Sequence, residues 1–82
     1  MAVGPYQPIA CALHEQLEFS VLRRVPLLLE YRQDNRVRQE QVLPSDVYTR
    51  EGAEWLKFRR DDGSEEAIRL DAILSFCEAL ER

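Results

Sequence analysis

Two cysteines and one histidine are the residues of this chain best suited to zinc binding or thiol catalysis. Cys11 and His14 lie close together in the sequence, whereas Cys77 lies near its other end. A structural zinc ion takes about four ligands, and these residues supply three at most. A Cys11/His14 nucleophile pair would also need an orienting group and an oxyanion site, which the sequence does not indicate. We expect no metal and no cofactor, and we expect both cysteines to be unpaired and buried, with a disulfide as the alternative.

Two other sets of residues have types and spacing that suit binding chemistry. Asp61-Asp62 and Glu65-Glu66 could form a calcium loop, but charged residues in such a place more often cover a solvated hairpin tip. Tyr31, Tyr48 and Trp55 could stack on RNA bases, although aromatic residues of a small domain more often form its core. Neither a phosphate-binding glycine loop nor a Gly-x-Ser-x-Gly elbow occurs. We therefore expect a binding protein and not an enzyme.

Length and composition limit the possible classes of protein. The 82 residues suffice for one domain with one small core, and the content of 45% hydrophobic and 32% charged residues is typical of a soluble folded domain. No apolar run approaches the roughly 20 residues of a membrane span, and residues 1–5 lack the basic and apolar parts of a signal peptide. We expect a cytoplasmic protein that does not enter a membrane and is monomeric when free.

The net charge of −4 is unevenly distributed. Up to Gln39 the chain has five basic and four acidic residues, whereas from Glu40 onward it has eleven acidic and six basic residues. Polyphosphate should repel such a domain at long range, so we expect no direct binding of nucleic acid and favour a basic partner. The alternative interpretation is that the surplus carboxylates only keep a small domain soluble.

The N-terminal part of the chain predicts an extended arm and one helix. Residues 1–9 contain two prolines, which disfavour helical backbone, and should lie extended across the domain. Apolar residues recur every fourth position from Leu13 to Val21, which indicates a helix over residues 10–24. Apolar and polar residues also alternate between residues 17 and 23, so a strand is the open alternative there.

If this helix forms, its outer face carries both acidic and apolar residues. Glu15, Glu18 and Leu22 fall opposite the core stripe, with Phe19 beside them, because residues three and four apart are neighbours on a helix. An acidic edge beside exposed apolar side chains is a plausible docking face. The alternative is that Phe19 and Leu22 pack under the arm and the two glutamates are merely solvated.

After Pro26 the hydrophobic pattern alternates with the period of β-strands. The pattern predicts a mainly β fold, a small SH3-like or Sm-like antiparallel barrel over residues 26–76, preceded by the helix and followed by a tail at 77–82. The C-terminal residues also fit a helical turn after a short last strand. The expected parts of the barrel are a hairpin of strands 27–32 and 37–43, an interruption at Pro44-Ser45-Asp46, a loop at 50–52, a strand at 55–60, a turn at 61–64 and a strand at 66–70.

Several short segments occur in a characteristic order between Tyr6 and Phe76. They are Tyr6-Gln7-Pro8-Ile9-Ala10-Cys11, Leu17-Glu18, Ser45-Asp46, Glu54-Trp55-Leu56 and Arg69-Leu70-Asp71-Ala72-Ile73. In these segments and their order, the chain resembles the Rof family of Rho-binding antiterminators, which are small bacterial proteins that stop the termination factor Rho from loading onto RNA.

The resemblance implies a partner and a set of contact residues. Rof-like proteins cover the primary RNA-binding surface of Rho with their N-terminal helix and a loop between strands. By position, Glu15 and Glu18 match acidic residues of that helix, and Arg50 matches a basic residue of the loop. The chain departs from the family pattern just after Cys11, where Ala12 and Leu13 replace acidic residues, and after Arg50, where Glu51 replaces a basic one.

The implied function is competition with RNA on Rho. We expect Glu15, Glu18, Phe19, Leu22 and Arg50 to contact Rho, to block RNA loading and so to cause antitermination. Two other classes remain open: an Sm-like module that binds single-stranded RNA itself, and a small structural adaptor of another complex.

Overall fold

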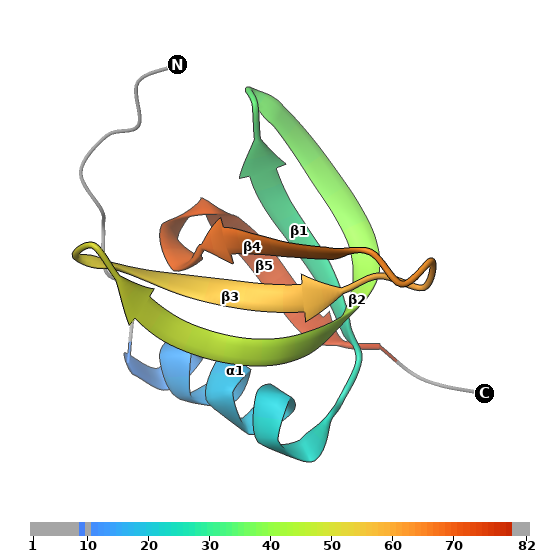
Figure 1. Cartoon of the computed structure of the whole chain (residues 1–82), viewed down its shortest axis with the longest axis horizontal. Helices are drawn as coiled ribbons and strands as arrows, with labels where there is room; N and C mark the ends of the chain where they lie inside the picture. Colours follow the sequence, from blue (N-terminus) through green and yellow to red (C-terminus); the bar gives the residue numbers. More distant parts are fainter. Residues whose placement is uncertain (1–8, 10, 80–82) are drawn as a thin grey trace.

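The computed structural model, whose residues 9 and 11–79 are described here, consists of one helix and a five-stranded antiparallel sheet (Figure 1). The strand order is β4-β3-β2-β1-β5, which confirms the prediction of a mainly β fold with one N-terminal helix. No described pairing joins the outer strands β4 and β5, so the sheet is open and is not a closed barrel. The elements are α1 (Cys11–Arg23), β1 (Leu27–Gln33), β2 (Arg36–Arg50), β3 (Ala53–Arg59), β4 (Glu65–Arg69), a 3₁₀ turn (Leu70–Ala72) and β5 (Ile73–Glu78).

Strand β2 joins the two halves of the sheet. Its first half pairs with β1, from Arg36 to Val42, and its second half pairs with β3, from Leu43 to Arg50. The register shifts between Pro44 and Asp46, so the predicted interruption is instead a bulge within one continuous strand. A bulge tolerates proline, which has no N–H to donate, and it increases the bend of the strand.

Two tight turns connect the first three strands. Asp34 and Asn35 link β1 to β2, and Glu51 and Gly52 link β2 to β3; all four have positive φ angles, between 52° and 77°. Two-residue turns of this kind match the right-handed twist of hairpin strands, and Asn, Asp and Gly accept the required backbone conformation best. The predicted loops at these two places and the turn at residues 61–64 are confirmed.

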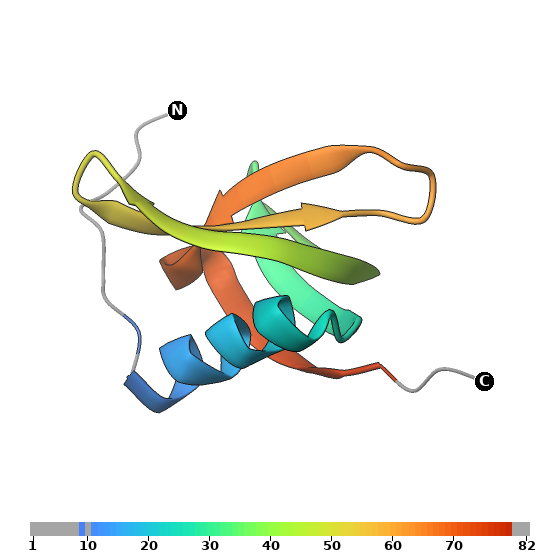
Figure 2. The same cartoon turned by 60° about the horizontal axis from the view of Figure 1, so that its bottom comes forward.

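The core lies between α1 and the concave side of the sheet, as the view in Figure 2 indicates. Leu17 is the fully buried anchor of the helix, and Tyr31 and Phe58 are the largest buried side chains of the core, with ring centroids 5.9 Å apart. None of the described helices is long and apolar enough to cross a membrane. The buried cluster consists of Leu17, Leu27, Leu29, Tyr31, Val42, Leu56, Phe58, Ile68 and Leu70.

Two further predictions are corrected by the structure. Residues 73–78 form strand β5 against β1, so the alternative of a helical turn is wrong there and the sheet includes Cys77 and Glu78. Both cysteines are unpaired as expected but exposed, contrary to the prediction. Cys11 begins α1 away from the side that carries Leu17, and Cys77 follows the inward-facing Phe76, so the alternation of β5 turns it outward. The predicted arm at residues 1–9, apart from Ile9, and residues 80–82 lie outside the described part of the chain.

Candidate functional site

Helix α1 is held in place by one buried stripe and a well-formed C-terminal cap. Leu17 is completely buried and Ser20 nearly so, which confirms the helix and excludes the strand alternative for this segment. Arg24 adopts a left-handed conformation with φ of 56°. The Val25 N–H donates to the Ser20 carbonyl at 3.0 Å, and the Arg24 N–H donates to the Val21 carbonyl at 3.3 Å. These two bonds form a Schellman motif, which ends the helix just before Pro26.

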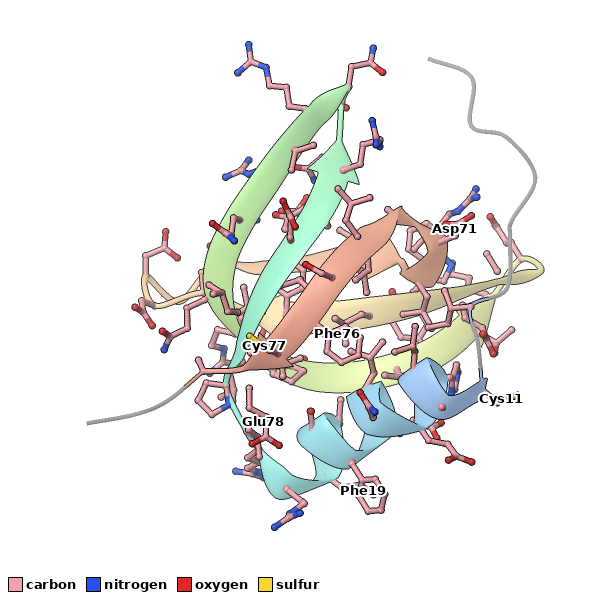
Figure 3. The ribbon with its side chains drawn as sticks, turned by 180° about the vertical axis from the view of Figure 1, so that it is seen from behind. Cys11, Phe19, Asp71, Phe76, Cys77 and Glu78 are labelled. Atoms are coloured by element: carbon pink, nitrogen blue, oxygen red, sulfur yellow. The ribbon has the colours of Figure 1, made fainter. Side chains whose placement is uncertain are left out.

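The predicted contact residues of the helix form one continuous stripe on the side away from the core. We call Glu15, Glu18, Phe19 and Leu22 the α1 outer face; their spacing of three, four and seven residues places them together. Phe19 is 61% exposed and Leu22 is 79% exposed, so the described part of the domain leaves most of each side chain uncovered. Figure 3 shows the Phe19 ring projecting from α1 away from the sheet.

Two carboxylates accompany these apolar side chains. Glu15 is exposed and makes no hydrogen bond or ion pair with any other residue among 9 and 11–79. The Oε2 atom of Glu18 lies 3.7 Å from Nδ1 of His14, whose Nε2 atom lies 3.2 Å from Oε2 of Glu54 at the start of β3. His14 therefore lies between Glu18 on α1 and Glu54 on the β2–β3 hairpin, and the side chain of Glu18 stays half exposed.

Arg50 lies on this hairpin and not on the α1 outer face. It is exposed at the end of β2, and its carbonyl accepts a hydrogen bond from Nε1 of Trp55 at 3.2 Å. Arg50, Tyr48 and Trp55 line a shallow hollow of about 220 Å³ together with Glu51. The hairpin extends to the same end of the molecule as the start of α1 (Figures 1 and 2), so one broad partner surface can reach both.

Sequence reasoning missed two hollows that flank α1. One, of about 330 Å³, lies where the helix passes the bulge of β2 and brings Asp46 and Val47 next to Glu18 and Leu22. The other, of about 230 Å³, lies between α1 and β5, where Phe19, Phe76 and Cys77 are among the lining residues (Figure 3). Neither was visible in the sequence, because both depend on which strands run beside the helix.

A separate charged network lies on the core side of the sheet, beside Tyr31 and Phe58. Nε of Arg60 donates to the Glu40 carboxylate at 3.0 Å, its Nη2 pairs with Glu66, and the guanidinium carbon lies 5.3 Å from the centre of the Phe58 ring. Burial works to raise the pKa of Glu40, but hydrogen bonds from Arg60 and Tyr31 outweigh it and hold that pKa below its usual value. Hydrogen bonds to Glu40 and Glu66 raise the pKa of Arg60. These groups satisfy one another, which favours a structural role.

Metal binding and base stacking find little support in this geometry. Among the residues that the structure describes, no group of three or more His, Cys, Asp and Glu side chains is placed to hold a metal ion. Tyr31 is completely buried and its hydroxyl donates to Glu40, so it presents no ring face to a base. Tyr48 and Trp55 are partly exposed beside Arg50.

Comparison with known proteins identifies no family for this chain. No protein-family model matches it, and no curated protein is significantly similar to it. Membership of the Rof family therefore stays a prediction. It can be tested by substitutions on the α1 outer face and the β2–β3 hairpin.

Proposed function

We propose that this protein is a non-enzymatic inhibitor that binds Rho at its primary RNA-binding surface, blocks RNA loading and so causes antitermination. The observation that carries the proposal is the α1 outer face, where two carboxylates flank two apolar side chains that are exposed in the free domain. The resemblance to the Rof family supplies the identity of the partner. The geometry of the face supplies the physical basis for binding it.

The composition of this face suits a protein partner. Large apolar side chains contribute most to association when they become buried at the centre of an interface, and charged groups at its rim set orientation and specificity. Phe19 and Leu22 can serve as the apolar centre, because more than half of each side chain remains to be covered. Glu15 and Glu18 flank them on the same helix and give the rim a negative charge.

The sign of the charge suits an RNA-binding surface as the target. A surface that binds phosphates is basic, so an acidic domain is attracted to it, whereas RNA itself is repelled by the net charge of −4. The contact should weaken as salt is added, since screening reduces the attraction between exposed charges. Arg50 would add a contact from the β2–β3 hairpin at the same end of the domain.

The proposal is tested by competition between this protein and RNA for Rho. Fluorescently labelled single-stranded RNA is bound to Rho at modest ionic strength, the protein is added, and the loss of RNA polarisation is followed. We expect displacement that becomes weaker with salt. The doubly reversed variant Glu15→Lys/Glu18→Lys should displace RNA at least about tenfold less well, because charge pairs turn into repulsive pairs.

A matched control separates the face from the overall charge. Asp34→Lys/Asp61→Lys changes the net charge by the same amount, but both residues lie in hairpin turns away from α1. This control should lose much less activity than the helix variant. Equal losses would mean that only overall charge matters, and simultaneous binding of RNA and protein to Rho would contradict the competition. Strong binding of single-stranded RNA without Rho would favour the RNA-binding alternative instead.

A further inference from the structure

The free end of the β1–β2 hairpin carries positive charge in a domain that is negative overall. Arg32, Arg36 and Arg38 are all exposed there. The sequence between Arg32 and Arg38 contains one acidic residue, Asp34 in the turn. Figures 1 and 3 show this end of the hairpin rising beyond the other strands, away from α1. The proposed contact with Rho uses none of these residues.

One edge of β2 is open along this part of the hairpin. Among the described strands, β3 pairs with β2 only from Leu43 onward. The two-residue turn closes on Gln33 and Arg36, and the closing pair of such a turn is hydrogen-bonded. Hydrogen-bonded and non-hydrogen-bonded pairs alternate along an antiparallel ladder. The N–H and C=O groups of Val37 and Gln39 therefore point away from β1, toward the open edge.

Charged and apolar side chains alternate along this edge. Arg36 and Arg38 lie on the core side of the sheet, because they stand opposite Gln33 and the buried Tyr31, and Val37 lies on the outer side. Nη1 of Arg38 lies 3.4 Å from Oε1 of Gln33. Arg36 makes no hydrogen bond or ion pair with any other residue among 9 and 11–79, and Val37 is 52% exposed. The edge thus presents two guanidinium groups on one side and an apolar group between them on the other.

We propose that this edge binds an extended acidic segment of a partner protein, in which two carboxylates flank one apolar residue. The segment would add to β2 as a further strand that hydrogen-bonds to Val37 and Gln39. Alternate residues of any extended chain are about 7 Å apart, so two such carboxylates would match the spacing of Arg36 and Arg38. The apolar residue between them would pack beside Val37. This inference does not rest on the proposed binding of Rho.

The composition of the hairpin end favours a protein partner over RNA. Binding of single-stranded RNA generally uses aromatic side chains on which the bases stack. No aromatic residue occurs from Arg32 to Gln41, and the preceding Tyr31 is completely buried. The net charge of −4 also repels a polyphosphate at long range. A short acidic segment carries less charge than a polyphosphate, and its backbone can pair with the open edge.

The test uses the full chain and short peptides. A blocked Glu-Val-Glu-Val-Glu peptide is titrated into the protein while the backbone amide signals of Val37 and Gln39 are followed by NMR. We expect saturable shifts in the millimolar range and slower exchange of these two amide protons. Gln-Val-Gln-Val-Gln lacks the charge and Glu-Glu-Glu-Val-Val lacks the alternation, so both should shift the signals much less.

Three results would overturn the proposal. The first is a titration that does not saturate. The second is equal shifts with all three peptides, which would mean that the arginines only keep an open edge from aggregating. The third is tighter binding of oligouridylate than of the acidic peptide at the same amides, which would make the edge a site for RNA.

Matched variants separate the edge from the overall charge. Arg36→Gln/Arg38→Gln should weaken binding of the acidic peptide several-fold. Arg23→Gln/Arg24→Gln removes the same charge from exposed residues at the end of α1, so it should leave peptide binding nearly unchanged. Circular dichroism checks that both variants are folded. Equal losses in the two variants would show that only the overall charge matters and would also contradict the proposal.

Discussion

The exposed apolar side chains of α1 allow a quantitative prediction. Phe19→Ala and Leu22→Ala should each weaken binding to Rho while the domain stays folded. The two side chains are 61% and 79% exposed in the free protein, so most of their surface is still available for burial by a partner. Alanine has the highest helix propensity, and neither side chain belongs to the buried core, so α1 should persist in both variants.

The magnitude follows from this exposure. Complete burial of a phenylalanine or leucine side chain contributes about 1.5–3 kcal/mol. Scaled by the fraction still exposed, each side chain can contribute roughly 1–2 kcal/mol to binding if the partner covers it. Since about 1.4 kcal/mol corresponds to a factor of ten, the dissociation constant should rise roughly 5- to 30-fold for each variant.

Displacement of labelled RNA from Rho measures this loss, and circular dichroism checks that each variant is folded. Val37→Ala is the matched control, because Val37 is also an exposed apolar residue, at 52%, but lies beside the β1–β2 turn. It should displace RNA as the unchanged protein does. If Phe19→Ala and Leu22→Ala are folded and displace RNA at unchanged concentrations, the apolar part of the α1 outer face does not take part in binding.

The remaining predictions concern stability and the thiols. Leu17→Ala should lower the free energy of unfolding by about 2–5 kcal/mol, measured by urea denaturation, because it leaves a cavity at the centre of the core. Glu40→Gln should cost about 1.5–3 kcal/mol at neutral pH, since it removes a charge-assisted bond from Arg60. The pKa of Glu40 is lowered by folding, so its contribution is complete above the unfolded value of about 4.3 and is lost as the pH falls through the folded value. The loss of stability caused by Glu40→Gln should therefore be smaller at pH 3 than at neutral pH, whereas the loss caused by Leu17→Ala should be the same at both pH values. Cys11 and Cys77 should both react rapidly with a thiol reagent in the folded protein, and substitution of both by alanine should leave the midpoint nearly unchanged.

Local patterns predicted the elements of this fold well. The apolar residues at every fourth position from Leu13 to Val21 indicated α1, and the Asp and Gly residues of the turns indicated where the hairpins bend. These signals depend on interactions between residues close in sequence, which the amino-acid types alone determine. The same holds for the α1 outer face, because residues 15, 18, 19 and 22 share a side of any helix.

Features that depend on distant partners were harder to predict. Pro44 usually breaks a strand, and only the register of β3 shows that a bulge absorbs it here. That Asp46 lines the same hollow as Glu18 was equally hard to predict, because the position of the bulge relative to α1 depends on tertiary packing. Cys77 is exposed because β5 pairs with β1 as a strand. The C-terminal sequence alone fits a helix as well as a strand, so it does not predict this pairing.

The pairing of β1 with β5 also bears on the order in which this chain can fold during synthesis. β1 is the first strand to be made and β5 the last, yet they are neighbours, with Leu27 opposite Glu78. Contacts between residues so far apart in sequence form late, because closing a long loop costs entropy before any contact repays it. On the ribosome, the β1 edge and the β5 side of α1 should remain uncovered until the last strand emerges. A nascent chain that stalls before residue 73 would then expose apolar surface to chaperones and proteases.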